Sequence, residues 1–149
     1  MVKDSALSEV TLRRYEKPYN LSKRELVKKI CLSLGLLQPG DSTDVIVDIL
    51  LVLIDSGKAR KELSLDEIKN LAVELRKKNN LEIKGIADSN IRRQLKRLRD
   101  IMLVEKQSNL YKITEFESLS SIFSSKLENF LIPQIIERIK EYLDSLDTQ

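Results

Sequence analysis

The chain has 149 residues, of which 42% are hydrophobic and 33% are charged, and its formal net charge is +3. This length suits one core of ordinary size with a short extension, and the composition is that of a folded chain. The sequence contains no histidine and one cysteine, Cys31, which excludes histidine-based catalysis or metal binding and any intrachain disulfide. We therefore expect a non-enzymatic protein that needs no metal or other cofactor.

No segment of the sequence indicates export or membrane insertion. The N-terminus, MVKDSALSEV, lacks the long apolar core of a signal peptide. The longest apolar run, 45–54, is interrupted by Asp48 and is much shorter than the roughly 20 residues that span a membrane. We expect a cytoplasmic protein with no membrane partner.

Residues 1–20 predict a basic N-terminal arm. The segment shows little periodicity, contains Pro18, and carries Arg13, Arg14 and Lys17, so a helix running through its end is not expected. Two interpretations stay open. The arm is either a mobile or loosely packed terminus, or a segment that contacts a phosphate backbone, a minor groove or a partner subunit.

Two helices are predicted after the arm. In the first, 22–34, Ser22 and Glu25 form a capping box ahead of apolar residues at helical spacing. The second, 41–56, starts with capping residues at 41–43 and contains the run VIVDILLVLI, which is apolar almost all round. Such a run indicates a central helix covered on most sides, with a buried strand as the alternative.

A short strand is expected at 61–63, and Ser64 with Glu67 forms a second capping box that begins the next helix. The connection that follows this helix, 79–87, is longer than the three or four residues of a standard helix-turn-helix. Either an extended turn or a strand at 81–83 that pairs with a hairpin would fit it.

The next helix is the most basic segment of the chain. Between Ser89 and Arg99 there are five basic residues and no acidic ones, and Asp88 or Ser89 is the expected N-cap. Basic residues occupy one face of this helix and apolar residues the other. The apolar stripe predicted to face the core consists of Ile91, Leu95, Leu98 and Met102.

After the basic helix, strands at 103–105 and 110–114 joined by a polar turn at 107–109 predict a hairpin. Residues 115–149 form a long helical segment, which Pro133 should kink or split into two helices. Its apolar stripe is longer than a small core can absorb, which indicates a partner. The predicted dimerisation residues are Leu119, Ile122, Phe123, Leu127, Phe130, Leu131, Ile135, Ile139 and Leu143.

Charge is unevenly distributed along the chain. The net charge is +4 for residues 1–40, −1 for 41–84, +4 for 85–114 and −4 for 115–149. A phosphate backbone would repel the acidic final segment, so that segment should lie away from any nucleic acid.

From about Asp44 to Thr114 the chain resembles the winged helix-turn-helix domains of bacterial and archaeal transcription regulators. The resemblance rests on IRRQLKRLRDIMLVEKQSNLYKIT, residues 91–114, where a basic helix runs into LVEK…YKIT, like the wing of those regulators. The Lys- and Ile-rich composition is similar to that of archaeal proteins. The implied fold is mainly α with a small β-hairpin, in which residues 21–114 form the winged-helix domain with its preceding N-terminal helix.

The resemblance also implies a function, with double-stranded DNA and a second copy of the chain as partners. Arginine is suited to guanine and asparagine to adenine in the major groove, and the later arginines of the helix suit phosphates. The candidate DNA-binding residues are Ser89, Asn90, Arg92, Arg93, Lys96, Arg97, Arg99 and, in the wing, Lys106. We expect a transcription regulator that forms a homodimer through residues 115–149. The alternatives are RNA binding and a winged-helix interaction module within a larger nucleic-acid-processing or chromosome-organising complex.

Overall fold

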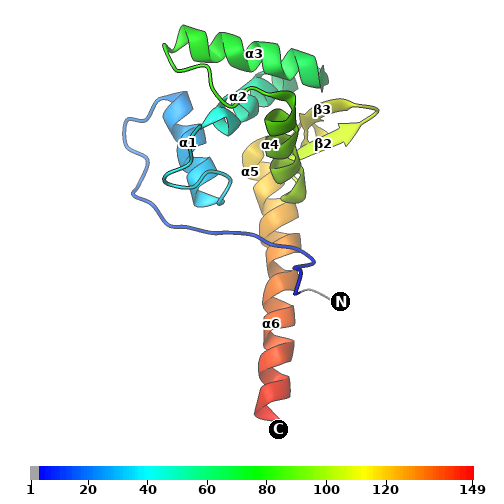
Figure 1. The fold of residues 1–149 in the computed structure, drawn as a ribbon. Coiled ribbons are helices and arrows are strands. Elements are labelled where there is room, and N and C mark those ends of the chain that lie inside the picture. Colours follow the sequence, from blue (N-terminus) through cyan, green and yellow to red (C-terminus); the bar gives the residue numbers. More distant parts are fainter. Residues whose placement is uncertain (1–3) are drawn as a thin grey trace.

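The structure is a computed structural model that describes residues 4–149, so the first three residues of the predicted arm lie outside it. The chain is mainly helical, as predicted, and the predicted hairpin is part of a small three-stranded antiparallel sheet. The helices are α1 (Lys23–Ser33), α2 (Val45–Lys58), α3 (Leu65–Lys78), α4 (Asp88–Asp100), η1 (Thr114–Phe116), α5 (Leu119–Ile122), η2 (Phe123–Leu131) and α6 (Ile132–Asp147). The strands are β1 (Leu63–Ser64), β2 (Val104–Gln107) and β3 (Leu110–Ile113). Figure 1 shows a globular part, which contains α1 to α5 and the sheet, and α6 protruding from it.

Helix α2 lies at the centre of the globular part, and all its residues from Val45 to Leu53 are buried. This confirms the predicted central helix over the strand alternative. The helix begins at Val45, later than predicted, and the Asp44 side chain makes no cap. The physical reason is that the Asp44 carboxylate binds Arg24 and Arg76 instead.

The two capping boxes are confirmed. Ser22 Oγ accepts from the Glu25 amide at 3.2 Å in α1, and Ser64 Oγ accepts from the Glu67 amide at 3.2 Å in α3. The other two predicted caps are wrong. The N-cap of α2 is Asp44 and not one of residues 41–43, and α4 is preceded by Ala87 and has no side-chain cap.

The sheet has the order β1-β3-β2, with both pairs antiparallel. The first strand begins at Leu63, so the expected strand at 61–63 was placed too early, and 81–83 forms no strand. The connection after α3 is therefore an extended turn. Ser108 and Asn109 have φ angles of 51° and 64°, the pair of positive values that a type I′ hairpin turn requires.

The C-terminal segment is helical without a sharp break from Leu119 to Asp147. Its middle portion, η2, is a π-helix, and the Ile132 amide donates to the Leu127 carbonyl five residues earlier. Pro133 lies in the first turn of α6, but the predicted split into two separate helices is wrong, because α5, η2 and α6 follow one another without a gap. A proline is tolerated there because its missing N–H falls where the hydrogen-bond pattern changes.

The core gathers around α2 from α1, α4, the sheet and the start of the C-terminal segment. Cys31 is fully buried, and burial raises the pKa of its thiol to about 12, so it is an inert core residue. Met102 was wrongly placed on the buried stripe of α4. It follows the end of that helix with a φ of 64° and is half-buried.

Candidate nucleic-acid interface

Helix α4 is anchored by its apolar face and presents its basic face outward. Ile91, Leu95 and Leu98 are each 0% exposed, which confirms those three members of the predicted stripe. Together they fix the rotation of the helix about its own axis. The opposite face therefore has a defined set of side chains in contact with solvent.

Five of the predicted DNA-binding residues lie together on that outer face. Ser89, Arg92, Arg93, Lys96 and Arg99 are all exposed. Within residues 4–149, Arg92 and Arg99 make no side-chain hydrogen bond or ion pair. Lys96 forms an exposed pair with Asp100 at 3.1 Å, an interaction worth less than about 1 kcal/mol. A phosphate could displace Asp100 at little cost.

Asn90, a predicted base contact, has a side chain that makes hydrogen bonds inside the fold. Its Nδ2 donates to the Gly85 carbonyl at 2.7 Å, while its Oδ1 accepts from Arg93 and Gln94. Gly85 has a φ of 75°, and a Cβ there would approach Thr43 to 2.7 Å. Asn90 thus closes the tight turn that leads into α4, in place of the missing cap.

Arg97, another predicted DNA contact, also makes hydrogen bonds within the chain. Its guanidinium donates to the Gly35 carbonyl at 2.9 Å and to Gln94 Oε1 at 3.1 Å. Gly35 lies in the turn after α1. The contact joins α4 to the turn after α1. Its two residues are 62 positions apart in the sequence, so no local pattern could predict it.

The hairpin lies beside α4 (Figure 1) and supplies few free cations. Lys106 is exposed, as predicted for the wing, but its ammonium lies 5.6 Å from the centre of the Tyr111 ring. Lys112 lies 4.7 Å from the centre of the Phe116 ring and 3.7 Å from Glu105. The hairpin therefore offers one modest backbone contact at Lys106.

A buried ion cluster, which the sequence did not indicate, holds the three helices behind α4. Asp48 is fully buried, and its carboxylate accepts from Arg24 of α1 and, at 2.7 Å, from Arg76 of α3. Arg76 also donates to Asp44 at 2.8 Å and to the Glu82 carbonyl at 2.7 Å. The cluster fixes α1, α2 and α3 relative to one another.

The charges in this cluster stabilise one another. Burial by itself would raise the pKa of Asp44, but the hydrogen bond and charge of Arg76 and the charge of Arg24 outweigh it, so the pKa is lowered. Burial by itself would lower the pKa of Arg76, but hydrogen bonds to Asp44 and Asp48 outweigh it and raise the pKa. Asp44 and Arg76 therefore stay charged at neutral pH.

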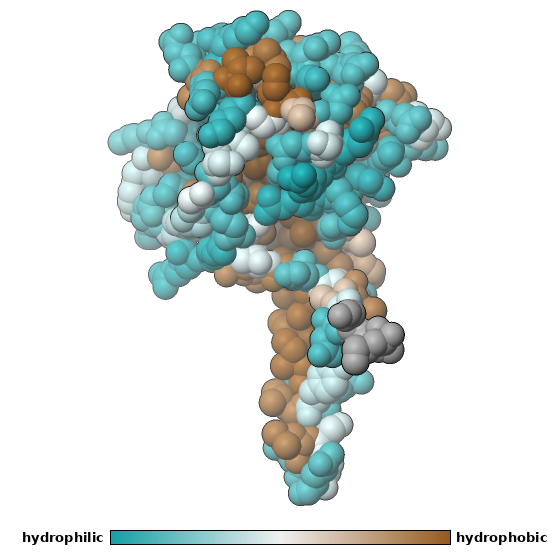
Figure 2. Space-filling model, in the orientation of Figure 1, coloured by the Kyte–Doolittle hydropathy of each residue, from teal (hydrophilic) through white to brown (hydrophobic). Residues whose placement is uncertain are grey.

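The predicted dimerisation stripe divides into two parts. Ile122, Leu127 and Leu131 are buried within this chain, so they are corrected to core residues, and Leu119 and Phe123 pack partly against the same core. Ile135 is half-buried, and Phe130, Ile139 and Leu143 are exposed. Figure 2 shows the apolar side chains of the protruding helix as a continuous stripe.

The N-terminal arm packs on its own chain. The Arg13 amide donates to the Ser33 carbonyl at 2.8 Å, and the Arg13 guanidinium donates to Gln38 at 2.6 Å. Glu16 pairs with Lys29 of α1. Arg14 and Lys17 are exposed and form no ion pair within residues 4–149, so these two remain available for a partner.

Within residues 4–149, no helix has both the length and the hydropathy needed to cross a bilayer, and no cluster of three or more potential metal ligands occurs. Comparisons of the chain with protein-family models, curated proteins and solved structures found no match.

Proposed function

We propose that this chain is a DNA-binding protein of the winged helix-turn-helix type that acts as a homodimeric transcription regulator. The element order α2, β1, α3, α4, β2, β3, with β3 between β1 and β2, is the order of a winged-helix domain and supports the proposal. The observation that carries it is α4, whose buried stripe leaves an outer face of exposed, largely unpaired arginines.

In this proposal α4 enters the major groove with its outer face toward the bases. Arg92 and Arg93 are suited to guanine, since a guanidinium can donate twice to one base edge. Lys96 and Arg99 then contact phosphates beside the groove, and Lys106 contacts the backbone from the hairpin. The two committed side chains, Asn90 and Arg97, set the position of α4 without touching DNA.

The proposed homodimer rests on α6, which has no buried residue. A long apolar stripe exposed on a protruding helix marks an interaction site. The rival proposal, an interaction module that docks on a different protein, rests on the same stripe. Light scattering separates the two, because a stable homodimer favours the regulator and a monomer favours the module.

The direct test is a titration of labelled duplex DNA with purified protein at low salt, followed by fluorescence anisotropy. Arg92→Ala with Arg93→Ala should weaken binding at least about 30-fold, from roughly 1–3 kcal/mol for each of the two arginine contacts to a base. The control is Lys77→Ala with Lys78→Ala, which removes the same charge from exposed residues at the C-terminal end of α3, away from α4 (Figure 1).

The control variant should bind like the unmodified protein. Equal losses of DNA affinity in both variants would show that net charge alone accounts for binding. Unchanged affinity in the Arg92 and Arg93 variant would contradict the proposal that α4 binds DNA. Stronger competition by structured RNA than by duplex DNA would favour an RNA-binding role.

A further inference from the structure

The apolar stripe of α6 has the spacing of a helix pair. Ile132, Ile136, Ile139, Leu143 and Leu146 follow one another at intervals of four and three residues, the seam spacing of a two-stranded coiled coil. Four of these side chains are well exposed, at 47% for Ile136, 52% for Ile139, 53% for Leu143 and 68% for Leu146. This face is built to pack on another helix.

A second apolar surface without a partner lies at the base of the protruding helix. A groove of about 520 Å³ runs between the N-terminal arm, α1 and the start of the C-terminal segment. Its apolar lining includes Leu21, Leu26, Ile30, Leu119 and Phe123. The groove and the α6 stripe lie on the same side of the molecule as α1 (Figures 1 and 2).

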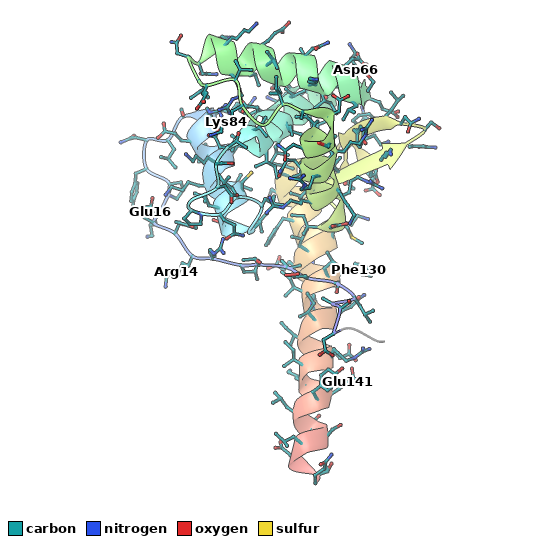
Figure 3. The ribbon with its side chains drawn as sticks, in the orientation of Figure 1. Arg14, Glu16, Asp66, Lys84, Phe130 and Glu141 are labelled. Atoms are coloured by element: carbon teal, nitrogen blue, oxygen red, sulfur yellow. The ribbon has the colours of Figure 1, made fainter. Side chains whose placement is uncertain are left out.

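The charges around these two surfaces are complementary. The second half of α6 and the residues after it, 141–149, contain Glu141, Asp144 and Asp147 and no lysine or arginine. The arm beside the groove carries the exposed Arg14 and Lys17. Figure 3 places Arg14 on the side of the arm that faces away from the globular part.

We propose that two copies of the chain pair their α6 helices in antiparallel orientation, so that the C-terminal half of each α6 covers the arm and groove of its partner. The proposal rests on the homodimer proposed above and specifies its geometry. A parallel pair would bring the two acidic C-terminal halves together and leave both grooves uncovered. An antiparallel pair places each acidic half beside a basic arm.

The lengths agree with this arrangement. At a rise of about 1.5 Å per residue, α6 extends about 24 Å from the globular part. A partner helix running in the opposite direction along the stripe brings its C-terminal end back to the base of the helix, where Phe123 and Leu119 line the groove.

Helix orientation is tested by a spin label at Gln149→Cys, with the distance measured by pulsed electron paramagnetic resonance without DNA. Cys31 is fully buried and does not compete for the label. An antiparallel pair that sets Asp144 of one helix level with Phe123 of the partner separates the labels by about 47 Å along the helix axis. A distance near the roughly 10 Å that separates paired helices, or the absence of any dimer, would overturn the proposal.

Groove occupancy is tested by two matched leucines. Leu26 lines the groove at 40% exposure, whereas Leu71 of α3 has 38% exposure and lies outside it. Leu26→Glu should weaken the dimer at least tenfold in sedimentation equilibrium, and Leu71→Glu should leave it unchanged. Equal effects of the two substitutions would overturn the groove contact.

A charge exchange tests the same contact without a substitution at Leu26, so a folding defect of the Leu26→Glu variant does not affect the result. Arg14→Glu with Lys17→Glu should weaken the dimer, and adding Asp144→Lys with Asp147→Lys should restore it. Failure of the restored charges to recover association would overturn the contact. These measurements contain no DNA, so they stand whether or not the DNA-binding proposal fails.

Discussion

Helices α4 and α6 are both amphipathic, but the chain buries the apolar face of only the first. The stripe of α4 is 0% exposed at all three positions, whereas no residue of α6 is buried. In α4 the polar face is therefore free to act, and in α6 the apolar face is free. We therefore propose that the functional face of each helix is the one that the chain's own core does not use.

The largest expected effect comes from breaking the buried ion cluster that holds the helices behind α4. Asp48→Asn leaves Arg24 and Arg76 without their buried counter-charge and should lower the free energy of unfolding by about 3–5 kcal/mol. Urea denaturation measures it. The control is Asp55→Asn, because Asp55 pairs with Lys23 at the surface with 60% of its side chain exposed, and such a pair contributes less than about 1 kcal/mol.

The second prediction compares the two helices directly. Leu95→Ala in α4 should cost about 2–5 kcal/mol of stability, because it leaves a cavity in the core. Leu143→Ala in α6 should leave the unfolding of the globular part within about 0.5 kcal/mol of the unmodified protein, as for surface substitutions, while it weakens dimerisation. Similar losses of stability in the two variants under monomeric conditions would remove the contrast between the helices.

How much of this contrast the sequence could predict depends on the range of the contacts. Helical periodicity identified Ile91, Leu95 and Leu98 correctly, because residues three and four apart share a face. It could not separate Ile122 and Leu127, which the chain buries, from Ile139, since all three continue one apolar pattern. Ile122 and Leu127 lie where the helix packs against the globular part, whereas Ile139 lies on the portion that extends beyond it.

The same limit applies to the candidate DNA-binding residues, because local patterns do not reveal contacts between distant parts of the chain. The exposed arginines Arg92, Arg93 and Arg99 could be predicted from the helical wheel alone. Asn90 and Arg97 could not be excluded, because their partners lie in turns whose backbone geometry no local pattern reveals. The ion pair between Asp48 and Arg76 joins residues 28 positions apart, and an arginine on a helix gives no sign of such a distant partner.

A smaller effect separates the two roles found on α4. Asn90→Ala should cost roughly 1 kcal/mol of stability, about the net worth of a hydrogen bond, with little direct effect on DNA contacts. Arg93→Ala should do the reverse, weakening DNA binding with stability nearly unchanged. Thermal unfolding and DNA titration of both variants check this. If Asn90→Ala lost DNA affinity at full stability, Asn90 would return to the list of DNA contacts.

The smallest predicted effect is on pH dependence. Because the folded pKa of Asp44 lies below its ordinary value of 3.8, the stabilisation is fully present above that value and is lost as the pH falls through the lower folded pKa. Urea denaturation between about pH 5 and pH 2 should show this loss. Asp44→Asn should reduce the pH slope, and an unchanged slope would mean that other carboxylates dominate acid unfolding.

The most direct test of the central claim is the salt dependence of duplex DNA binding. If the outer face of α4 contacts DNA, the logarithm of the affinity should fall steeply with the logarithm of the salt concentration, since each phosphate contact contributes about 0.9 to the slope. We predict that Lys96→Ala with Arg99→Ala, which removes the two proposed phosphate contacts of α4, makes this slope shallower by about 2, and that Lys77→Ala with Lys78→Ala leaves it unchanged. The same slope in all three proteins would contradict the assignment of α4 as the DNA-binding helix.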